Sequence, residues 1–372
     1  MELNRLVNLL LFCSFSTALF TACGDSSDSP APVDAERDPM AYMSLSITAV
    51  EASSGIGSRV DDYYFEEPTL DNEKISTMRF LIVDKDGSVE HNISISQNPD
   101  VMTAKRLFKV KPNETKTVYL FANEASIPED VINVFRNLKK GERFPVDTYG
   151  TYTLSRSSDS PLFAAGEPIP MTEVHQVEIG APQYDANGNP DPYEATLFVT
   201  RAAVKLSFSL NVADSYIKFD PSELSEITFN EVGDMEYLFP CNTTYEPIKA
   251  PDPIDSKINR IITAYSVPTN AETHSWSLSW SPVGDSNRSF SAGPVYMPET
   301  KLGNGSEQPY TITLPVNGVE LTAPLPNLPS LPRNTHVLVQ INLKGSSMVC
   351  VVTVVPYTGV DLTPEFGIDR DD

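Results

Sequence analysis

Hydrophobic and polar residues alternate with a period of two in many segments of the chain. In the first such segment, Met43, Leu45, Ile47 and Ala49 alternate with serine and threonine. Similar alternation or a short apolar run recurs at 78–83, 118–122, 195–199, 204–210, 337–343 and 349–355. Because successive side chains of a strand point to opposite faces of a sheet, this pattern predicts a chain built mainly from partly buried strands.

One segment has the pattern of a helix. Val131, Val134, Phe135 and Leu138 share a helical face, Ser126 is the expected N-cap, and Pro128 lies near the first turn. The chain has 31 Pro and 18 Gly, and prolines at this density break helices and end strands. The sequence therefore predicts an all-β fold of β-sandwiches with one or few short helices.

The first 22 residues have the pattern of an export signal. Arg5 precedes an apolar run over 6–20, and two small residues then lead to Cys23. The run is shorter than the ~20 apolar residues that a membrane-spanning helix needs. A cysteine in this place favours a lipoprotein signal, in which Cys23 is acylated, with palmitate among the expected chains, and becomes the mature N-terminus. An ordinary signal with an incidental cysteine is the alternative. The polar stretch 24–32 is then a tether.

Length and charge limit the possible functions. The chain has 372 residues, which at ~150 per domain suggests two domains, and the loop 185–191 followed by new strands places the boundary between about residues 185 and 205. With 50 acidic and 27 basic residues the net charge is -23. Such a charge excludes nucleic acid as a partner, because phosphates require a basic face, and it fits a protein that faces the cell exterior.

The sequence carries no recognisable catalytic motif. It has no Gly-x-Ser-x-Gly elbow, phosphate loop, His-Glu-x-x-His or paired cysteine motif, and its four histidines are scattered. We therefore predict a protein that is not an enzyme and has no catalytic residues, no cofactor and no metal. The loop 185–194 offers oxygen ligands at alternate positions, but its spacing departs from the EF-hand, and an Asn-Gly hairpin explains it better.

Two features leave alternatives open. Cys241 and Cys350 either form a disulfide in an oxidising compartment or remain buried thiols. Trp276, Leu278 and Trp280 are expected on one strand face, which is either core or an aromatic platform for sugar. An aromatic platform for sugar would correspond to an alternative function, that of a glycan-binding surface lipoprotein that stays monomeric and acylated.

The order and spacing of several segments together resemble the FimA-like fimbrillins, the subunits of type V pili in Bacteroidales. The segments are the leader ending at Cys23, the strand 43–50 followed by 57–60, the strand 78–83 with its Asp-Gly turn, 118–123, 169–172, 201–205, 333–345, and 354–357, where the family more often has Trp after the Pro. The resemblance implies two transthyretin-like β-sandwich domains and a structural role at the outer membrane and in a surface fimbrium that supports cell adhesion.

The resemblance also implies a processing step. Such precursors are anchored by lipid in the outer membrane and are then cut after an arginine by a trypsin-like protease, which here predicts cleavage between Arg59 and Val60. Exposed loops of small residues are where proteases cut. The expected parts are a signal peptide (1–22), a tether with a removable first strand (23–59), an N-terminal domain (60–198) and a C-terminal domain (199–372).

The resemblance further implies that loss of the first strand, with Met43, Leu45, Ile47 and Ala49, leaves a groove that a neighbouring fimbrial subunit fills by strand exchange. The tail of this chain offers Val360, Leu362 and Phe366 at the spacing of a donor strand, although Pro364 between them cannot donate a hydrogen bond. Arg59 argues against a base anchor, which would keep its first strand. The tail favours a shaft subunit, with a tip subunit as the second choice.

Overall fold

The structure, a computed structural model, describes a defined part of the chain. The described residues are 40–49, 70–101, 103–148, 152–155, 166–213, 224, 226–233, 235–240, 258–260, 271–284, 288–299, 310–326, 328, 331, 333–345 and 347–355. Strands dominate this part, and α1 (Glu129–Arg136) is its α-helix, accompanied by the short 3-10 helices η1 (Asp71–Glu73) and η2 (Glu124–Ser126). None of these helices is long and apolar enough to cross a bilayer.

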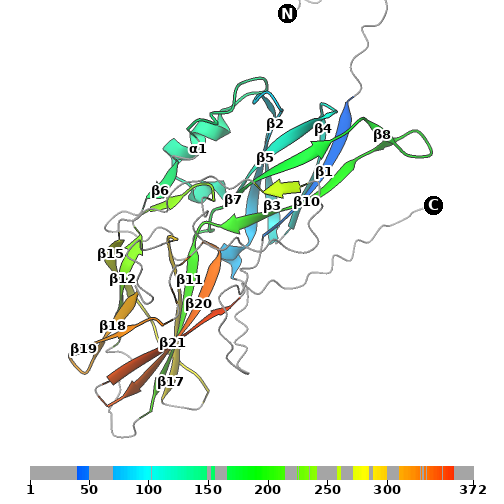
Figure 1. The fold of residues 1–372 in the computed structure, drawn as a ribbon. Helices are drawn as coiled ribbons and strands as arrows, with labels where there is room; N and C mark the ends of the chain where they lie inside the picture. Colours follow the sequence, from blue (N-terminus) through cyan, green and yellow to red (C-terminus); the bar gives the residue numbers. More distant parts are fainter. Residues whose placement is uncertain are drawn as a thin grey trace, which may run out of the picture. The chain divides into compact units, whose positions relative to one another are not determined.

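Eight strands form the largest sheet (Figure 1). In the order of hydrogen-bonded neighbours they are β3 (Val89–Val101), β2 (Ile75–Val83), β5 (Glu114–Ala122), β7 (Met171–Ile179), β10 (Tyr193–Arg201), β1 (Ala41–Ala49) and β4 (Thr103–Val110), and β14 (Ile258–Arg260) pairs with β7. The paired residues of β10 and β7 are Thr200 with Thr172 and Arg201 with Met171. Beyond this short contact the sheet divides into two layers.

The core of this first sandwich lies between the layer β3-β2-β5-β7 and the layer β10-β1-β4. One continuous cluster joins Met78, Phe80 and Ile82 of β2 to the buried residues of β1, β4 and β10. The rings of Phe80 and Phe108, on β2 and β4, have their centroids 5.2 Å apart. The apolar residues at alternate positions of these strands therefore point into the core, as the sequence pattern predicts.

The helix covers the other face of β2 and β5. Ile132 and Phe135 of α1 are buried against Leu81 and Phe121, with Val131, Val134 and Leu138 packed beside them. The predicted helix and its apolar face are thus confirmed, but the predicted cap is wrong. The N-cap is Pro128, which makes no side-chain cap bond, and Ser126 belongs to η2, because the chain turns through a 3-10 segment before the helix begins.

Two further sheets enclose the second core. The five-stranded sheet has the order β16 (Ser281–Pro282), β17 (Ser289–Met297), β11 (Val204–Val212), β20 (Thr335–Lys344) and β21 (Ser347–Val355), and the four-stranded sheet has the order β15 (Ala271–Ser277), β12 (Glu226–Gly233), β18 (Thr311–Val316) and β19 (Val319–Pro324). Their inward residues form one cluster within 204–352. Asn317 and Gly318, both at positive φ, make the tight turn between β18 and β19.

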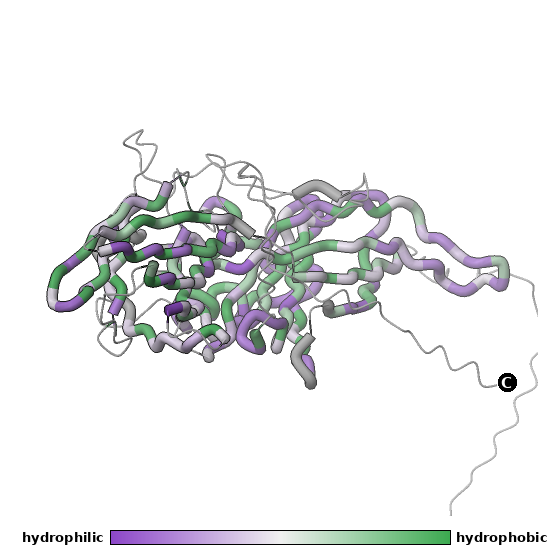
Figure 2. Tube along the Cα trace, turned by 90° about the horizontal axis from the view of Figure 1, so that it is seen from below, coloured by the Kyte–Doolittle hydropathy of each residue, from purple (hydrophilic) through white to green (hydrophobic). Residues whose placement is uncertain are grey.

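The predicted all-β fold of two sandwiches is confirmed, and the strands predicted at 43–49, 78–83, 118–122, 195–199, 204–210, 337–343 and 349–355 lie within observed ones. Figure 2 shows hydrophobic residues along the strands of both halves. Two short pairs complete the fold, β13 (Met235–Tyr237) with β6 (Thr153–Ser155) and β8 (Gln183–Tyr184) with β9 (Pro190–Asp191). The segments 235–239 and 258–260 return from the second half of the chain to contact β6, β7 and the cluster around α1.

Candidate functional site: the groove filled by the first strand

The strand β1 occupies a position between two strands from distant parts of the chain. It runs parallel to β10, with Met43 opposite Tyr193 and Ala49 opposite Val199. On its other side it runs antiparallel to β4, with Ala41 opposite Val110 and Thr48 opposite Thr103. In the described sheet β4 is a terminal strand whose neighbour is β1, so β1 alone joins β4 to the rest of the sheet (Figure 1).

The inward side chains of β1 are buried. Met43, Leu45 and Ile47 each have 0% relative exposure, and Ala41 and Ala49 have 1% and 2%. Burial of a large apolar side chain contributes about 1.5–3 kcal/mol, so the three large residues contribute roughly 4.5–9 kcal/mol before ordering costs are subtracted. The segment predicted as the removable strand is therefore an integral part of the first sandwich.

Two walls enclose β1, and the sequence pattern identifies one of them. The wall from β10 carries Leu197 and Val199 inward and was predicted as a strand. The wall from β4 carries Ala104, Phe108 and Val110 inward, and sequence reasoning missed it. Its alternation is obscured by an exposed Leu107 (54%) and by Arg106, which occupies the alternate position between the buried Ala104 and Phe108 but is exposed.

The outward face of β1 is polar and uncharged. Its residues Tyr42, Ser44, Ser46 and Thr48 are flanked on β4 by lysines and on β10 by an acidic residue. Lys105 lies opposite Ser46 and Lys109 opposite Tyr42, while Glu194 lies opposite Ser44. The ammonium of Lys105 is 3.6 Å from the carboxylate of Glu194, across the outer surface of β1.

Other predicted site residues lie outside the described residues. These are Cys23, the expected lipidation site; Arg59 and Val60, the expected cleavage site; and Val360, Leu362 and Phe366, the expected donor strand. Their predicted roles stay predictions. The structure does fix the flanks of the cleavage segment, because β1 ends at Ala49 and Leu70, the next described residue, lies just before η1.

The first anchored residue after that segment is Glu73 of η1. Its carboxylate accepts hydrogen bonds from the Tyr296 hydroxyl at 2.7 Å and the Leu70 backbone N–H at 3.0 Å, and it lies 2.9 Å from the ammonium of Lys205. Both Glu73 and Lys205 are buried. Burial beside this carboxylate raises the pKa of the Tyr296 hydroxyl far above its usual range, so that hydroxyl remains a donor. The chain downstream of the predicted cut is thus held by residues of the second half.

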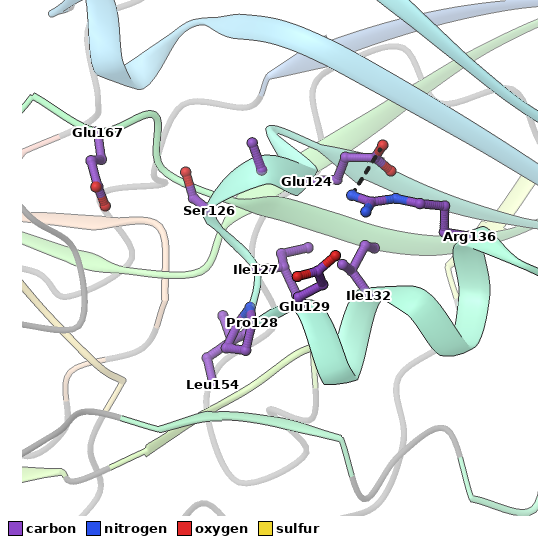
Figure 3. A pocket seen from close by; sticks show the side chains of 10 residues that line it. Glu124, Ser126, Ile127, Pro128, Glu129, Ile132, Arg136, Leu154 and Glu167 are labelled. Atoms are coloured by element: carbon purple, nitrogen blue, oxygen red, sulfur yellow. Dashed lines mark ion pairs between the residues drawn. The ribbon is translucent and has the colours of Figure 1, made fainter.

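A hollow of about 500 Å³ lies beside α1 and β6 (Figure 3). Ile132 and Leu154 line part of it, and Arg136 reaches across to Glu124 at 3.6 Å. The same carboxylate accepts two hydrogen bonds from Arg79, at 2.6 and 3.0 Å. Because two guanidinium groups already engage Glu124, it is committed to structural ion pairs and is a poor candidate for acid–base chemistry.

The remaining candidates from the sequence have structural roles. Strand β15 ends at Ser277, so Leu278 and Trp280 do not extend a strand face as predicted; Leu278 is buried in the second core and Trp280 packs against it. Asp185 accepts hydrogen bonds from the backbone of Asn187 and from Asn189, as the predicted hairpin requires. Within the described part, no cluster of three acidic, histidine or cysteine residues could hold a metal ion.

Cys350 is a buried free thiol, and burial raises its pKa to about 12. Cys241 lies outside the described residues. Of the two alternatives for Cys350, the structure therefore has the free thiol.

Comparison with known proteins identifies the fold. No protein-family model and no curated protein sequence matches the chain. The solved structure of the tip fimbrial protein Mfa3 from Porphyromonas gingivalis, with a C-terminal truncation, matches with a TM-score of 0.51 and 14% identity over 85% of this chain and 99% of that chain. A fimbrilin (FimA) from P. gingivalis W83 is similar with a TM-score of 0.47 and 12% identity, over 85% of this chain and 98% of that one.

A fimbrial assembly protein from Parabacteroides distasonis is similar too, with a TM-score of 0.45 and 10% identity over 86% of this chain and 99% of that chain. The match to Mfa3 shows that this chain has the fold of a fimbrial protein. The resemblance to the FimA-like fimbrillins is thereby confirmed at the level of the fold.

Proposed function

We propose that this chain is a subunit of a surface fimbrium that supports cell adhesion and that polymerises by strand exchange after proteolytic removal of its first strand. The observation that carries the proposal is the position of β1. Its inward side chains are buried and it joins β4 to β10, yet its connection to the following residues runs only through the segment 50–69. A single cut in that segment, after Arg59, converts β1 from part of the chain into a non-covalently held segment.

Departure of β1 leaves a groove suited to another strand. β4 loses its neighbour in the sheet, and β10 retains pairing to β7 only at Thr200 and Arg201. Unpaired backbone groups on both sides and an apolar floor form a template for an incoming strand. Backbone N–H and C=O groups left without hydrogen-bond partners in the empty groove are costly. A donor strand that takes the place of β1 restores the hydrogen bonds and apolar contacts that are lost when β1 leaves.

The donor in this proposal is the tail of another copy, through Val360, Leu362 and Phe366, and the subunit belongs to the shaft, with the tip as the second choice. Cys23 carries the acyl chain that holds the precursor at the outer membrane until a trypsin-like protease cuts after Arg59. The glycan-binding alternative loses support because Trp280 packs against the core instead of forming an open platform.

Controlled processing tests this proposal. An arginine-specific protease applied to the folded precursor is expected to yield a product that begins at Val60 and then forms a ladder of SDS-resistant oligomers. The R59A variant should remain uncut and monomeric, whereas the matched R37A variant should assemble normally, because a cut at Arg37 leaves β1 attached. Removal of residues 356–372 should stop the ladder but not folding. Ladder formation by uncut R59A, or by the truncated chain, contradicts the proposal.

A further inference from the structure

One wall of the β1 groove is basic in a strongly acidic protein. Of the eight residues of β4, Lys105, Arg106 and Lys109 are cationic and exposed, whereas the whole chain has a net charge of -23. Positive charge is therefore concentrated on a strand that borders the proposed docking site.

The two lysines have a defined relation to the groove. Lys105 and Lys109 are four residues apart, so they share one face of β4, and they lie opposite Ser46 and Tyr42 on the outward face of β1. Because β1 is uncharged, it offers them no carboxylate. Lys105 approaches Glu194 of β10, and Lys109 forms no ion pair with any carboxylate in the described part of the chain. The resident strand thus leaves this positive charge incompletely compensated.

The tail of this chain has the complementary pattern. Residues 356–372 contain five acidic residues and one arginine. Asp361 and Glu365 are also four residues apart, and they alternate with Val360, Leu362 and Phe366. In a strand whose apolar residues enter the groove, both carboxylates face outward, on the side where Lys105 and Lys109 lie.

We propose that the tail of a second copy enters the groove in the direction of β1 and in the register that pairs Asp361 with Lys109 and Glu365 with Lys105. This inference rests on the strand-exchange function proposed above and adds the chemistry that selects the partner. The basic wall of β4 recognises an acidic donor strand and fixes its register. Opposite charges on directly opposed strand residues are favourable, and like charges there are unfavourable.

The same register suits the apolar positions. Leu362 then takes the place of Met43, and Phe366 takes the place of Ile47, which lies opposite the small Ala104 of β4. If the tail is shifted by two residues toward the position of the C-terminal end of β1, its apolar side chains still point inward. Asp361 then lies opposite Leu107, and the pairing of the two carboxylates with Lys109 and Lys105 is lost. Charge therefore decides between registers that the alternation of apolar residues leaves equivalent.

A simpler role for the lysines is protection of an edge strand, because charged residues on an edge prevent unwanted pairing between sheets. Charge reversal separates the two roles. A glutamate protects an edge as well as a lysine does, so K105E/K109E leaves assembly unchanged if protection is the whole function. If the lysines recognise the tail, the same variant repels Asp361 and Glu365.

The test measures ladder formation by full-length chains cut with an arginine-specific protease, which spares introduced lysines. K105E/K109E and D361K/E365K should each slow assembly about tenfold or more, and the four substitutions together should restore the rate to within about threefold. Raising the salt concentration from 0.15 to 1 M should slow the wild type, because the screening length falls from about 8 to about 3 Å.

Disulfide trapping tests the register directly. K109C combined with D361C should link neighbouring copies in the assembled ladder, because opposed strand residues lie within disulfide range, and the matched pair L107C with D361C should not. Equal trapping of both pairs, or charge reversals that slow nothing or are not mutually rescued, overturns this inference while leaving strand exchange intact. Failure of the cut wild type to assemble overturns both proposals.

Discussion

Truncation of Leu45 to alanine measures how much β1 contributes to the stability of the first core. The side chain is fully buried, opposite Ala195 of β10 on one side and Arg106 of β4 on the other. Removal of a buried leucine side chain costs about 2–5 kcal/mol, because the lost transfer free energy adds to the cavity left behind. We expect L45A to lower the free energy of unfolding of the uncut chain by this amount.

The matched control is the neighbouring outward residue. Ser46 is half-buried on the opposite face of β1, so S46A should change stability by less than about 0.5 kcal/mol. Urea unfolding of both variants, followed by tryptophan fluorescence and circular dichroism, gives the two values. If L45A unfolds within 0.5 kcal/mol of S46A, β1 does not contribute to the core, and the reasoning behind the groove is refuted.

The same variant has a second consequence after cleavage. Once the chain is cut after Arg59, β1 is held only by non-covalent contacts, and a loss of 2–5 kcal/mol corresponds to about 30- to 5,000-fold weaker retention of the fragment. Dissociation of the fragment, followed by mass spectrometry of the separated species, should therefore be much faster for L45A than for S46A. Equal dissociation rates would show that release of β1 does not pass through loss of these core contacts.

Three further predictions concern the second half of the chain and its junction with the first. E73Q should destabilise the chain by about 3–5 kcal/mol in urea unfolding, because it removes the negative charge of the carboxylate that lies 2.9 Å from the buried Lys205 ammonium. D71N, in the exposed pair with Lys74, should have no measurable effect. A small cost for E73Q would contradict the buried ion pair. Burial lowers the pKa of His336 to about 3, so as the pH falls the imidazole takes up a proton in the unfolded chain before it does so in the folded one. The histidine should therefore reduce the free energy of unfolding by up to about 1.4 kcal/mol per pH unit below about pH 6.5. H336N should show a shallower fall in the urea midpoint between pH 7.5 and 5, and a slope equal to that of the wild type would count against this pKa. Because burial raises the pKa of Cys350 to about 12, thiol reagents at pH 8 should label this cysteine only as the chain unfolds. Peptide mapping of the labelled chain can check this. Rapid labelling of Cys350 in the folded chain would show that the thiol is not buried.

Local patterns predicted the strands well and their partners poorly. The alternation from Met43 to Ala49 was sufficient to identify β1 and its inward face, because burial on one face of a strand imposes a period of two. Its parallel pairing with β10 joins residues about 150 positions apart, and no local signal encodes that choice. β4 escaped notice because Arg106 and Leu107 reverse the alternation at its centre.

The junction between the two sandwiches was also hidden from the sequence. Lys205 occupies a polar position of an alternating strand, which suggests a solvent-facing side chain, yet it is buried against Glu73. The reason is that its strand, β11, is covered there by η1 from the other end of the chain. Burial of such a lysine depends on a carboxylate that lies 132 positions away in the sequence. Local sequence patterns do not predict contacts between residues so far apart.

Buried charge at this junction has a consequence for the proposed assembly by strand exchange. Arg201, at the end of β10, donates from its guanidinium to the backbone carbonyl of Glu73 and to the side chain of Asn334, and Arg333 approaches Glu236 at 2.9 Å. In the proposed fibre a donor strand enters the first sandwich, while the chain's own donor leaves from the second. Tension along the fibre then crosses this junction in every subunit. Apolar contacts slide with little directional preference, whereas hydrogen-bonded charges lose their partners as soon as they are displaced and are then left buried and unpaired, at a cost of several kcal/mol. A junction built from such groups resists small displacements more strongly than an apolar one of equal area, which is the property that the proposed fibre requires of a subunit under tension.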